Sequence, residues 1–367
     1  MLKTENQNVI KTFNYALFLA MIVIFAMGLT TLFSATKGLG YQSLYKSQLF
    51  YFLGGLVIGA VILFVDIEMW EKLSYVFYVG CGILLILVLA IGKVGGGSQR
   101  WIPIGPLHIQ PSEFAKIAVI FAYAKYFSNA KDPGPYTLRS LMTPALLIGP
   151  FFILILIQPD IGTAGIVFLV GASMVLFLGV HWKSILIVAI AGLITVPLAY
   201  KYGLKQYQRD RVTTFLDPGR DPRGTGYNAL QCKIAVGSGQ IAGRGFLKGT
   251  QSQLNFIPEQ HTDFIFSVFA EERGFIGALI LLATYYAYIL FSLRTVGRAR
   301  SKFEMLLAFG FAALMFWHVF INIGMVSGIL PIVGVTLPFF SYGGSSLLTF
   351  MVSTALLLNV SRKRYIF

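Results

Sequence analysis

Ten long apolar segments run along the chain, and they restrict the folds available to it more than any other feature. They lie at residues 13–34, 48–65, 74–92, 113–128, 142–158, 161–180, 184–200, 264–291, 305–329 and 338–360. A helix needs about 20 mostly apolar residues to cross a bilayer, and most of these segments reach or approach that length. The 113–128 segment is short, so we expect it to be tilted, interrupted or partly re-entrant. The pattern predicts an all-α polytopic membrane protein with about ten transmembrane helices.

The composition excludes a soluble domain. Of the 367 residues, 56% are hydrophobic and 12% are charged, and the mean hydropathy is +0.73, as is typical of membrane proteins. The two cysteines, Cys81 and Cys232, give neither a disulfide framework nor a metal-ligand spacing. The first apolar segment is long enough to span and is followed by no small-residue cleavage site, so we interpret it as a transmembrane helix.

An even number of spans places both termini on one side of the membrane, and the basic residues indicate which side. If the N-terminus is cytoplasmic, the inner segments hold fourteen Lys and Arg, namely Lys3, Lys11, Lys72, Lys125, Lys131, Arg139, Lys183, Arg294, Arg298, Arg300, Lys302, Arg362, Lys363 and Arg364. The short outer loops then hold four, namely Lys37, Lys46, Lys93 and Arg100. This bias predicts cytoplasmic termini. Much of the net charge of +14 is therefore a topology signal, and no nucleic-acid partner is implied.

The largest hydrophilic segment, residues 201–262, is predicted to be an extracytoplasmic loop. It holds nine Lys and Arg against four acidic residues, and within it Tyr227–Val236 could form a short amphipathic helix on the membrane surface. Loops of this length are usually functional. A basic loop suits an anionic ligand such as a pyrophosphate headgroup, although attraction to anionic membrane lipids explains the charge equally well.

Charged residues gather where this loop enters the next apolar segment. Asp263 stands at the boundary, and Glu271, Glu272 and Arg273 follow within the segment. Each charge carried into hydrocarbon costs about 2.5–3.5 kcal/mol, so the group needs an explanation. One interpretation is an internally paired helix entry that only fixes packing. The other is a catalytic carboxylate at the membrane surface.

A single prominent carboxylate indicates one kind of sugar chemistry over another. Glycosidases need two carboxylates, because a poor leaving group must be protonated. Transfer from a lipid pyrophosphate has a good leaving group, so one general base together with cations is enough. Asp263 is our candidate base, and His261 is the rival candidate.

A second polar constellation precedes the short apolar segment. Pro111 is suited to the first turn of a helix, and Glu113 and Lys116 would share one face of that helix and could pair. The pair is either structural or lines a cavity that receives a headgroup. Arg100 and Trp101 fit an interfacial belt, or a phosphate-contacting and sugar-stacking pair.

A third constellation, Pro331–Ser346, contains two prolines and a Gly-Gly step that interrupt any continuous helix. Such backbone is tolerated at a membrane only where it is buried in protein or lines a wet cavity. Ser341, Gly343 and Gly344 are therefore candidate ligand contacts, and a tight turn packed against its neighbours is the alternative.

Two weaker signals are interpreted structurally. The glycine-rich run Gly237–Gly245 resembles a nucleotide-binding loop only superficially, because its spacing is wrong and no βαβ unit surrounds it. Asp160 lies at the end of an apolar segment, where a helix-boundary role is expected and a substrate-facing polar group is the alternative.

Several of these stretches, taken together and in order, resemble the shape, elongation, division and sporulation (SEDS) family of peptidoglycan polymerases. They are Arg100–Gly105, Gln110–Glu113, Phe215–Pro218, Pro258–Phe266, Glu271–Glu272 and Leu337–Ser346. The resemblance runs from the first span to the last, so we treat 1–367 as a single membrane domain. Gly249–Leu254 is more similar to the elongation (RodA) type than to the division (FtsW) type.

The resemblance implies a ten-helix enzyme that polymerises lipid II, the undecaprenyl-pyrophosphate disaccharide-pentapeptide, into β-1,4 glycan outside the bacterial cytoplasmic membrane. Asp263 matches the family's essential carboxylate, and Glu113 and Lys116 match a polar pair in the same cavity. Lys116 and Arg211 are expected to stabilise the leaving pyrophosphate. A divalent cation (Mg²⁺ or Mn²⁺) at the pyrophosphate would fit, although no ligand cluster requires one. The implied partner is a class B penicillin-binding protein.

Two other functions compete with this one. A lipid II flippase would use the charges to line a translocation path, but it would favour charges near the membrane midplane. A non-catalytic scaffold of a cell-wall complex would need none of the charges.

Overall fold

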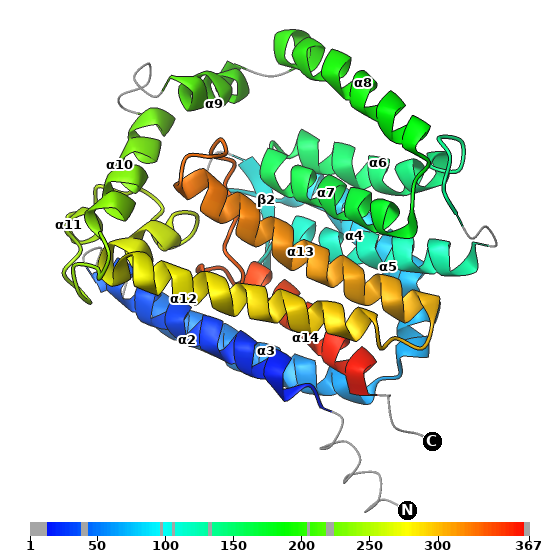
Figure 1. The fold of residues 1–367 in the computed structure, drawn as a ribbon, viewed down its shortest axis with the longest axis horizontal. Helices are drawn as coiled ribbons and strands as arrows, with labels where there is room; N and C mark the ends of the chain where they lie inside the picture. Colours follow the sequence, from blue (N-terminus) through cyan, green and yellow to red (C-terminus); the bar gives the residue numbers. More distant parts are fainter. Residues whose placement is uncertain are drawn as a thin grey trace, which may run out of the picture.

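Helices occupy all ten predicted segments (Figure 1). The computed structural model describes residues 13–37, 43–95, 98–104, 107–130, 134–203, 206–217 and 224–362. The ten helices are α2 (Tyr15–Lys37), α3 (Ser43–Phe64), α4 (Ile67–Ile91), α5 (Pro111–Asn129), α6 (Met142–Ile157), α7 (Ile161–Leu178), α8 (Trp182–Leu198), α12 (Ile265–Val296), α13 (Lys302–Val326) and α14 (Gly344–Arg362). Within the described chain, seven of them are long and apolar enough to cross a membrane. The all-α polytopic architecture is confirmed.

The short segment forms the continuous helix α5, without the interruption or re-entrance that its length allowed. Helix α5 packs against α4, α6, α7 and α13, and most of its side chains are buried. Because protein rather than lipid surrounds it, it can carry Glu113, Lys116 and Lys125 along a single helix. Its weak apolar signal therefore reflects its central position.

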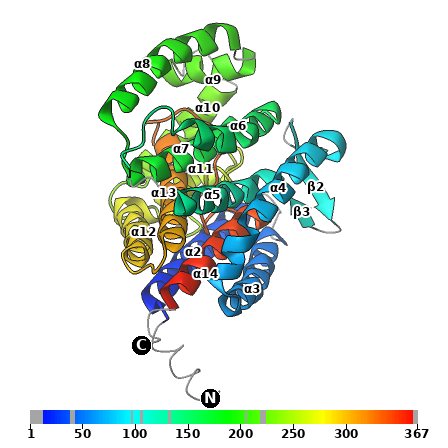
Figure 2. The same cartoon turned by 90° about the vertical axis from the view of Figure 1, so that its right-hand side faces the viewer.

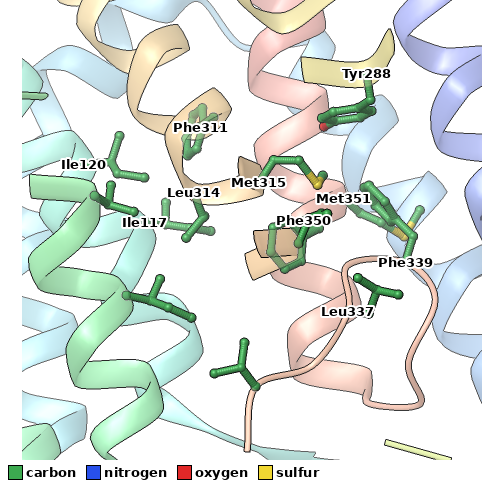
Figure 3. Packing of buried hydrophobic residues seen from close by; sticks show 14 of the residues in the cluster. Ile117, Ile120, Tyr288, Phe311, Leu314, Met315, Leu337, Phe339, Phe350 and Met351 are labelled. Atoms are coloured by element: carbon green, nitrogen blue, oxygen red, sulfur yellow. The ribbon is translucent and has the colours of Figure 1, made fainter. Parts of the chain in front are cut away.

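The centre of the bundle is an apolar core shared by α5, α13 and α14 (Figure 3). Ile117 and Ile120 come from α5, Phe311 and Leu314 from α13, and Phe350 from α14. All five are at most 2% exposed. This core fixes the positions of α5 and α13, which carry most of the polar side chains described below.

A small antiparallel sheet, absent from the sequence prediction, joins α4 to α5. Its strands are β1 (Lys93–Gly95), β2 (Ser98–Ile104) and β3 (Leu107–Ile109), in the order β1-β2-β3, with Ile102 paired to Ile109. Strand β2 carries Arg100 and Trp101, and it lies beside the ends of α4 and α5.

Helix α8 stands apart from the main helix bundle in both views of the fold (Figures 1 and 2). Its main contact is with the π-helical turn η1 (Ala199–Gly203) that follows it. Side chains around its circumference, such as Ile187, Ile190 and Leu193, are 48–76% exposed. A helix that is apolar all round and touches little protein is suited to a lipid environment.

Within the predicted extracytoplasmic loop, the structure contains α9 (Gln206–Leu216), α10 (Thr225–Ser238) and α11 (Thr250–Gln253). Helix α10 confirms the helix expected over Tyr227–Val236, and its position on the membrane surface stays a prediction. It packs against α12 and buries Cys232 and Ala235 completely. The loop is thus tied to the helix that follows Asp263.

The glycine-rich run after α10 repairs a break in α12. Helix α12 is interrupted at Gly274, where φ is 66° and ψ is −165°. Four hydrogen bonds join the break to residues 240–245, from the N–H groups of Arg244, Gly245, Phe275 and Ile276 to the carbonyls of Glu271, Glu272, Gln240 and Ile241, at 2.8–3.1 Å. Backbone groups that the break releases are therefore paired.

The glycines of this run permit the contact. A Cβ on Gly239 would lie 2.1 Å from the Ala270 carbonyl oxygen, and a Cβ on Gly243 would lie 2.2 Å from that of Glu272. Packing against α12 explains the run, in agreement with the rejection of a nucleotide-binding loop. We call residues 239–245 the strap.

Two buried carboxylates extend this attachment. Glu271 accepts hydrogen bonds from the N–H groups of Gln251 (2.9 Å) and Ser252 (3.2 Å). Glu272 accepts from the N–H of Leu247 at 3.0 Å and from the Ser34 hydroxyl. The acidic pair therefore anchors the loop, which is the packing interpretation for these two residues.

Gly243→Ala should destabilise the protein more than Gly245→Ala. Both glycines have positive φ (84° and 100°), but a Cβ on Gly245 would meet only the flexible Lys248 side chain at 3.4 Å. Gly243→Ala must also displace strap hydrogen bonds, at a further cost of about 1–3 kcal/mol. Melting in detergent would measure the difference. Equal melting temperatures for the two variants would contradict this account of the strap.

Candidate active site

A polar cleft of about 520 Å³ opens at the end of the bundle where the predicted outer connections meet. Its described lining comes from β2, α5, α7, α13, α14 and the segments that precede α12 and α14. The lining residues are Arg100, Trp101, Gln110, Glu113, Asp160, Thr163, Ile166, Glu259, Thr262, Asp263, His318, Val333, Gly334, Val335, Thr336, Tyr342, Gly343, Ser345 and Ser346. The structure thus brings together the three constellations predicted from the sequence.

Asp263 lines this cleft two residues before α12 begins, and three hydrogen bonds from two other elements hold the backbone around it. The Asn322 side chain donates to the Asp263 carbonyl at 3.0 Å. The Ser341 hydroxyl donates to the Thr262 carbonyl at 2.6 Å, and the Tyr342 N–H donates to the His261 carbonyl at 2.9 Å. Helix α13 and the 331–343 segment therefore fix where the carboxylate stands.

The 331–343 segment passes directly behind the carboxylate. A Cβ on Gly334 would lie 3.2 Å from Asp263 Oδ2, and Gly334 has a φ of 71°. Asn322 also donates to the Val335 carbonyl at 2.6 Å, so one side-chain amide is hydrogen-bonded to both the Asp263 backbone and this segment. Here non-helical backbone lines a polar cavity, which is one of the two outcomes that the sequence left open.

Glu113 and Lys116 form the predicted ion pair, with Lys116 Nζ 2.8 Å from Glu113 Oε1. The same Nζ lies 2.9 Å from His318 Nε2. Glu113 and His318 line the cleft, whereas Lys116 is 1% exposed and lies beneath them. A direct contact between Lys116 and a leaving group would require exposure that this residue does not have. Its charge acts on the cleft through its two partners.

Arg100 is bound to the turn between α6 and α7. Its guanidinium donates to the Gln158 carbonyl at 2.9 Å and to the Pro159 carbonyl, and it lies 3.7 Å from Asp160 Oδ2. Trp101 lines the cleft beside it. Sugar stacking by Trp101 and phosphate contact by Arg100 stay predictions.

Asp160 has the expected helix-boundary role and is also part of the cleft. Its carboxylate caps α7 by accepting from the Thr163 N–H at 3.1 Å. It also accepts from the Gln110 amide at 3.2 Å. The sequence signal was correct but incomplete, because only the fold places Asp160 opposite Gln110.

Of the remaining candidate ligand contacts, some line the cleft and others support its walls. Gly343 lines the cleft, and its N–H donates to the Gln48 side chain at 3.2 Å. Ser341 is 5% exposed and does not line it; its hydroxyl accepts from the Leu337 N–H at 2.8 Å and donates to the Thr262 carbonyl, so it braces the turn before Asp263. Gly344 begins α14, where a Cβ would lie 3.0 Å from the Tyr51 ring.

His261 lies outside the lining, although its backbone supports Tyr342. Burial lowers the pKa of its imidazole below the ordinary value, and the nearby Glu259 carboxylate opposes the shift. Arg211 belongs to α9, and its side chain lies outside the described residues, so its role stays a prediction.

His318 and Asn322 are two of the residues at this site that the sequence analysis missed. They stand four residues apart on one face of α13, a helix whose other buried side chains are mostly apolar. Polar residues inside a membrane segment mark functional sites by default, and this signal could have identified them.

Carboxylates dominate the charge of the described lining. Among the described residues, no group of three or more His, Cys, Asp or Glu side chains could hold a metal ion. The described lining holds four carboxylates, from Glu113, Asp160, Glu259 and Asp263, against the guanidinium of Arg100. Mg²⁺ often binds through one or two carboxylates together with substrate phosphates, and this lining is compatible with that arrangement.

Comparison with known proteins decides the family. The profile of the family described as "Cell cycle protein" (FtsW, RodA and SpoVE) matches residues 7–366. The chain belongs to the FtsW/RodA/SpoVE family. Among relatives, it is 42% identical over 310 residues to the *Escherichia coli* K12 "Peptidoglycan glycosyltransferase MrdB", covering 84% of this chain and 83% of that protein. It is 35% identical over 328 residues to the *Bacillus subtilis* "Stage V sporulation protein E", covering 86% of this chain.

Two solved structures share the FtsW/RodA/SpoVE fold with this chain. A chain from "Structural coordination of polymerization and crosslinking by a peptidoglycan synthase complex" has a TM-score of 0.84 and 32% identity, covering 97% of this chain and 99% of that one. The *Thermus thermophilus* rod shape determining protein RodA has a TM-score of 0.73 and 28% identity, covering 97% and 98%.

Removing either member of the Glu113–Lys116 pair should destabilise the protein. Glu113→Gln or Lys116→Met leaves a buried charge without its partner, which costs about 3–5 kcal/mol. Melting temperatures in detergent would measure the loss, and polymerisation of lipid II would measure the effect on the cleft. Full activity of the double variant with the two residues exchanged would show that the pair is purely structural.

Proposed function

We propose that this chain is a peptidoglycan glycosyltransferase of the elongation type, which polymerises lipid II into β-1,4 glycan strands. The observation that carries this proposal is Asp263, a carboxylate that lines a polar cleft at one end of a membrane bundle. Family membership and the 42% identity to a protein named peptidoglycan glycosyltransferase support it.

In the proposed reaction, Asp263 is the general base. It removes the proton from the 4-hydroxyl of the acceptor sugar, and the oxygen attacks the anomeric carbon of the donor. The new C–O bond forms as the bond to the pyrophosphate breaks, so an α-linked donor gives a β-linked product in one inverting displacement. No covalent glycosyl-enzyme is needed, because a single displacement already inverts the anomeric configuration, and Asp263 alone serves as the base.

The leaving pyrophosphate requires positive charge. Arg100 is the guanidinium in the described lining, and Arg211 is the further candidate from the loop. Four lining carboxylates oppose an anion, so we propose that a divalent cation, Mg²⁺ or Mn²⁺, accompanies the pyrophosphate. Phosphate oxygens would supply most of its ligands, with Glu259 at the exposed rim as the candidate carboxylate. The cation would neutralise the charge that develops on the leaving group.

The position of the charges favours an enzyme over a flippase or a scaffold. The cleft lies among the ends of the helices and their connections, whereas a translocation path would place charged residues near the midplane. A scaffold gives no reason for a glycine behind the Asp263 carboxylate. The identity to MrdB (42%) exceeds that to the sporulation relative (35%), which supports the elongation type over other family members.

We propose that the partner is a class B penicillin-binding protein, which would cross-link the strands. One structural neighbour comes from a complex described as coordinating polymerisation and crosslinking. The proposed location is the bacterial cytoplasmic membrane, with both termini inside and the cleft outside.

Asp263→Asn should abolish polymerisation without unfolding the protein. The amide has nearly the same shape but no basicity, and loss of a positioned base typically costs about 10²–10⁴-fold in rate. The measurement is glycan formation from lipid II by the purified protein with its partner. His261→Ala should have the smaller effect, since His261 does not line the cleft.

Near-normal activity of the Asp263→Asn protein would remove this residue from the mechanism and make Glu113 or His261 the next candidate base. The same assay with EDTA tests the cation. An unchanged rate would show that none accompanies the pyrophosphate.

Cysteine labelling would test the topology. Cys81 and Cys232 are buried, and Lys248 and Arg298 are exposed positions in segments predicted to lie outside and inside. Lys248→Cys should react with an impermeant maleimide on intact cells, and Arg298→Cys should react only after the membrane is opened. The reverse pattern would place the cleft on the cytoplasmic face and contradict the proposed function.

A further inference from the structure

His318 is a buried imidazole that the reaction proposed above does not use. It lies in the C-terminal half of α13 with 1% of its surface exposed, and its ring packs edge-on against Phe350 at 4.8 Å between centroids. Both ring nitrogens have partners. A buried, fully engaged histidine in a membrane segment needs an explanation.

The partners define a single hydrogen-bonding state of the ring. Nε2 lies 2.9 Å from Lys116 Nζ, and Nδ1 lies 3.1 Å from the Thr336 carbonyl oxygen. An ammonium can only donate and a carbonyl can only accept. Nε2 therefore accepts from Lys116, and Nδ1–H donates to Thr336. This is the neutral Nδ1–H tautomer, because an imidazolium would direct an N–H at the ammonium.

Through these contacts His318 connects the two carboxylates on which the site depends. On one side Lys116 holds Glu113 Oε1 at 2.8 Å. On the other side Thr336 stands two residues after Gly334, which packs behind Asp263. The ring thus bridges the ion pair on α5 and the segment that supports the candidate base.

The bridge also makes the two oxygens of the Glu113 carboxylate unequal. Oε1 is bound by Lys116, whereas the buried Oε2 has no hydrogen-bond partner among the described residues. Glu113 lines the cleft and is 5% exposed. A buried carboxylate oxygen without a partner is costly. Lys116, which His318 contacts, is therefore the group that holds this carboxylate in place.

We propose that His318 is a positioning residue for glycosyl transfer. By accepting from Lys116 it fixes the Glu113–Lys116 pair, which forms part of the cleft wall, in register with the segment behind Asp263. This inference rests on the proposed function. The contact with Lys116 positions the ion pair, and the contact with Thr336 orients the imidazole ring.

Two amide variants separate the two contacts. In His318→Gln, the longer side chain places its amide near the position of Nε2 and can accept from Lys116. In His318→Asn, the shorter side chain places its amide near Nδ1 and can donate to Thr336 only. Each is compared with wild type in lipid II polymerisation by the protein with its partner, with melting temperatures measured in parallel.

The expected result is a ranking. His318→Gln should retain activity within about 10-fold of wild type, whereas His318→Asn should lose about 10²-fold in kcat, the effect of a displacement of about 1 Å at a site. Both should melt at similar temperatures. The proposal would be overturned if the two variants had the same rate, whatever that rate is, or if the His318→Asn protein were the faster one.

Failure of the proposed function is distinguishable from failure of this inference. If wild type makes no glycan, the function is wrong. If wild type polymerises lipid II, Asp263→Asn does not, and the two His318 variants have the same rate, only the positioning role of His318 is wrong.

Discussion

Backbone hydrogen bonding at membrane depth is the constraint on which the rest of this structure depends. Lipid offers no donors or acceptors, so each interruption of a helix must be repaired by protein. The break at Gly274 is repaired by the strap, whose N–H and carbonyl groups pair with residues 271–276. At the other end of the bundle, the Asn359 amide donates to the carbonyls of Ile62 and Val65 at the end of α3, both at 2.7 Å.

The same constraint shapes the candidate active site. The 331–343 segment is not helical, and its carbonyls are taken up by side chains from other elements, including Asn322 at Val335 and His318 at Thr336. These hydrogen bonds place polar side chains in a region where apolar packing would exclude water. The carboxylate of Asp263 then stands against Gly334 in a cleft whose walls are already fixed by hydrogen bonds. The hydrogen bonds that satisfy the backbone are therefore the same ones that preorganise the site.

Local sequence signals succeeded wherever neighbours along the chain make the contact. The Glu113–Lys116 pair follows from a spacing of three residues on one helix, and the capping role of Asp160 follows from its place before α7. Asp263 was identified from its position at a membrane boundary. Ser341 was chosen as a ligand contact because its segment could not be helical, but its buried hydroxyl braces the Asp263 turn instead. Residue type alone does not say on which side of a segment a cavity lies.

The sequence by itself determined the ten helices and the family, because apolar length and short motifs are local properties. Only the tertiary structure decided which polar groups share a cleft. His318 and Lys116 are 202 residues apart, and Gly334 and Asp263 are on different segments. Their contacts depend on how α5, α13 and the 331–343 segment pack around the apolar core, and on the absence of lipid-borne partners for polar atoms. No spacing along the chain encodes that geometry.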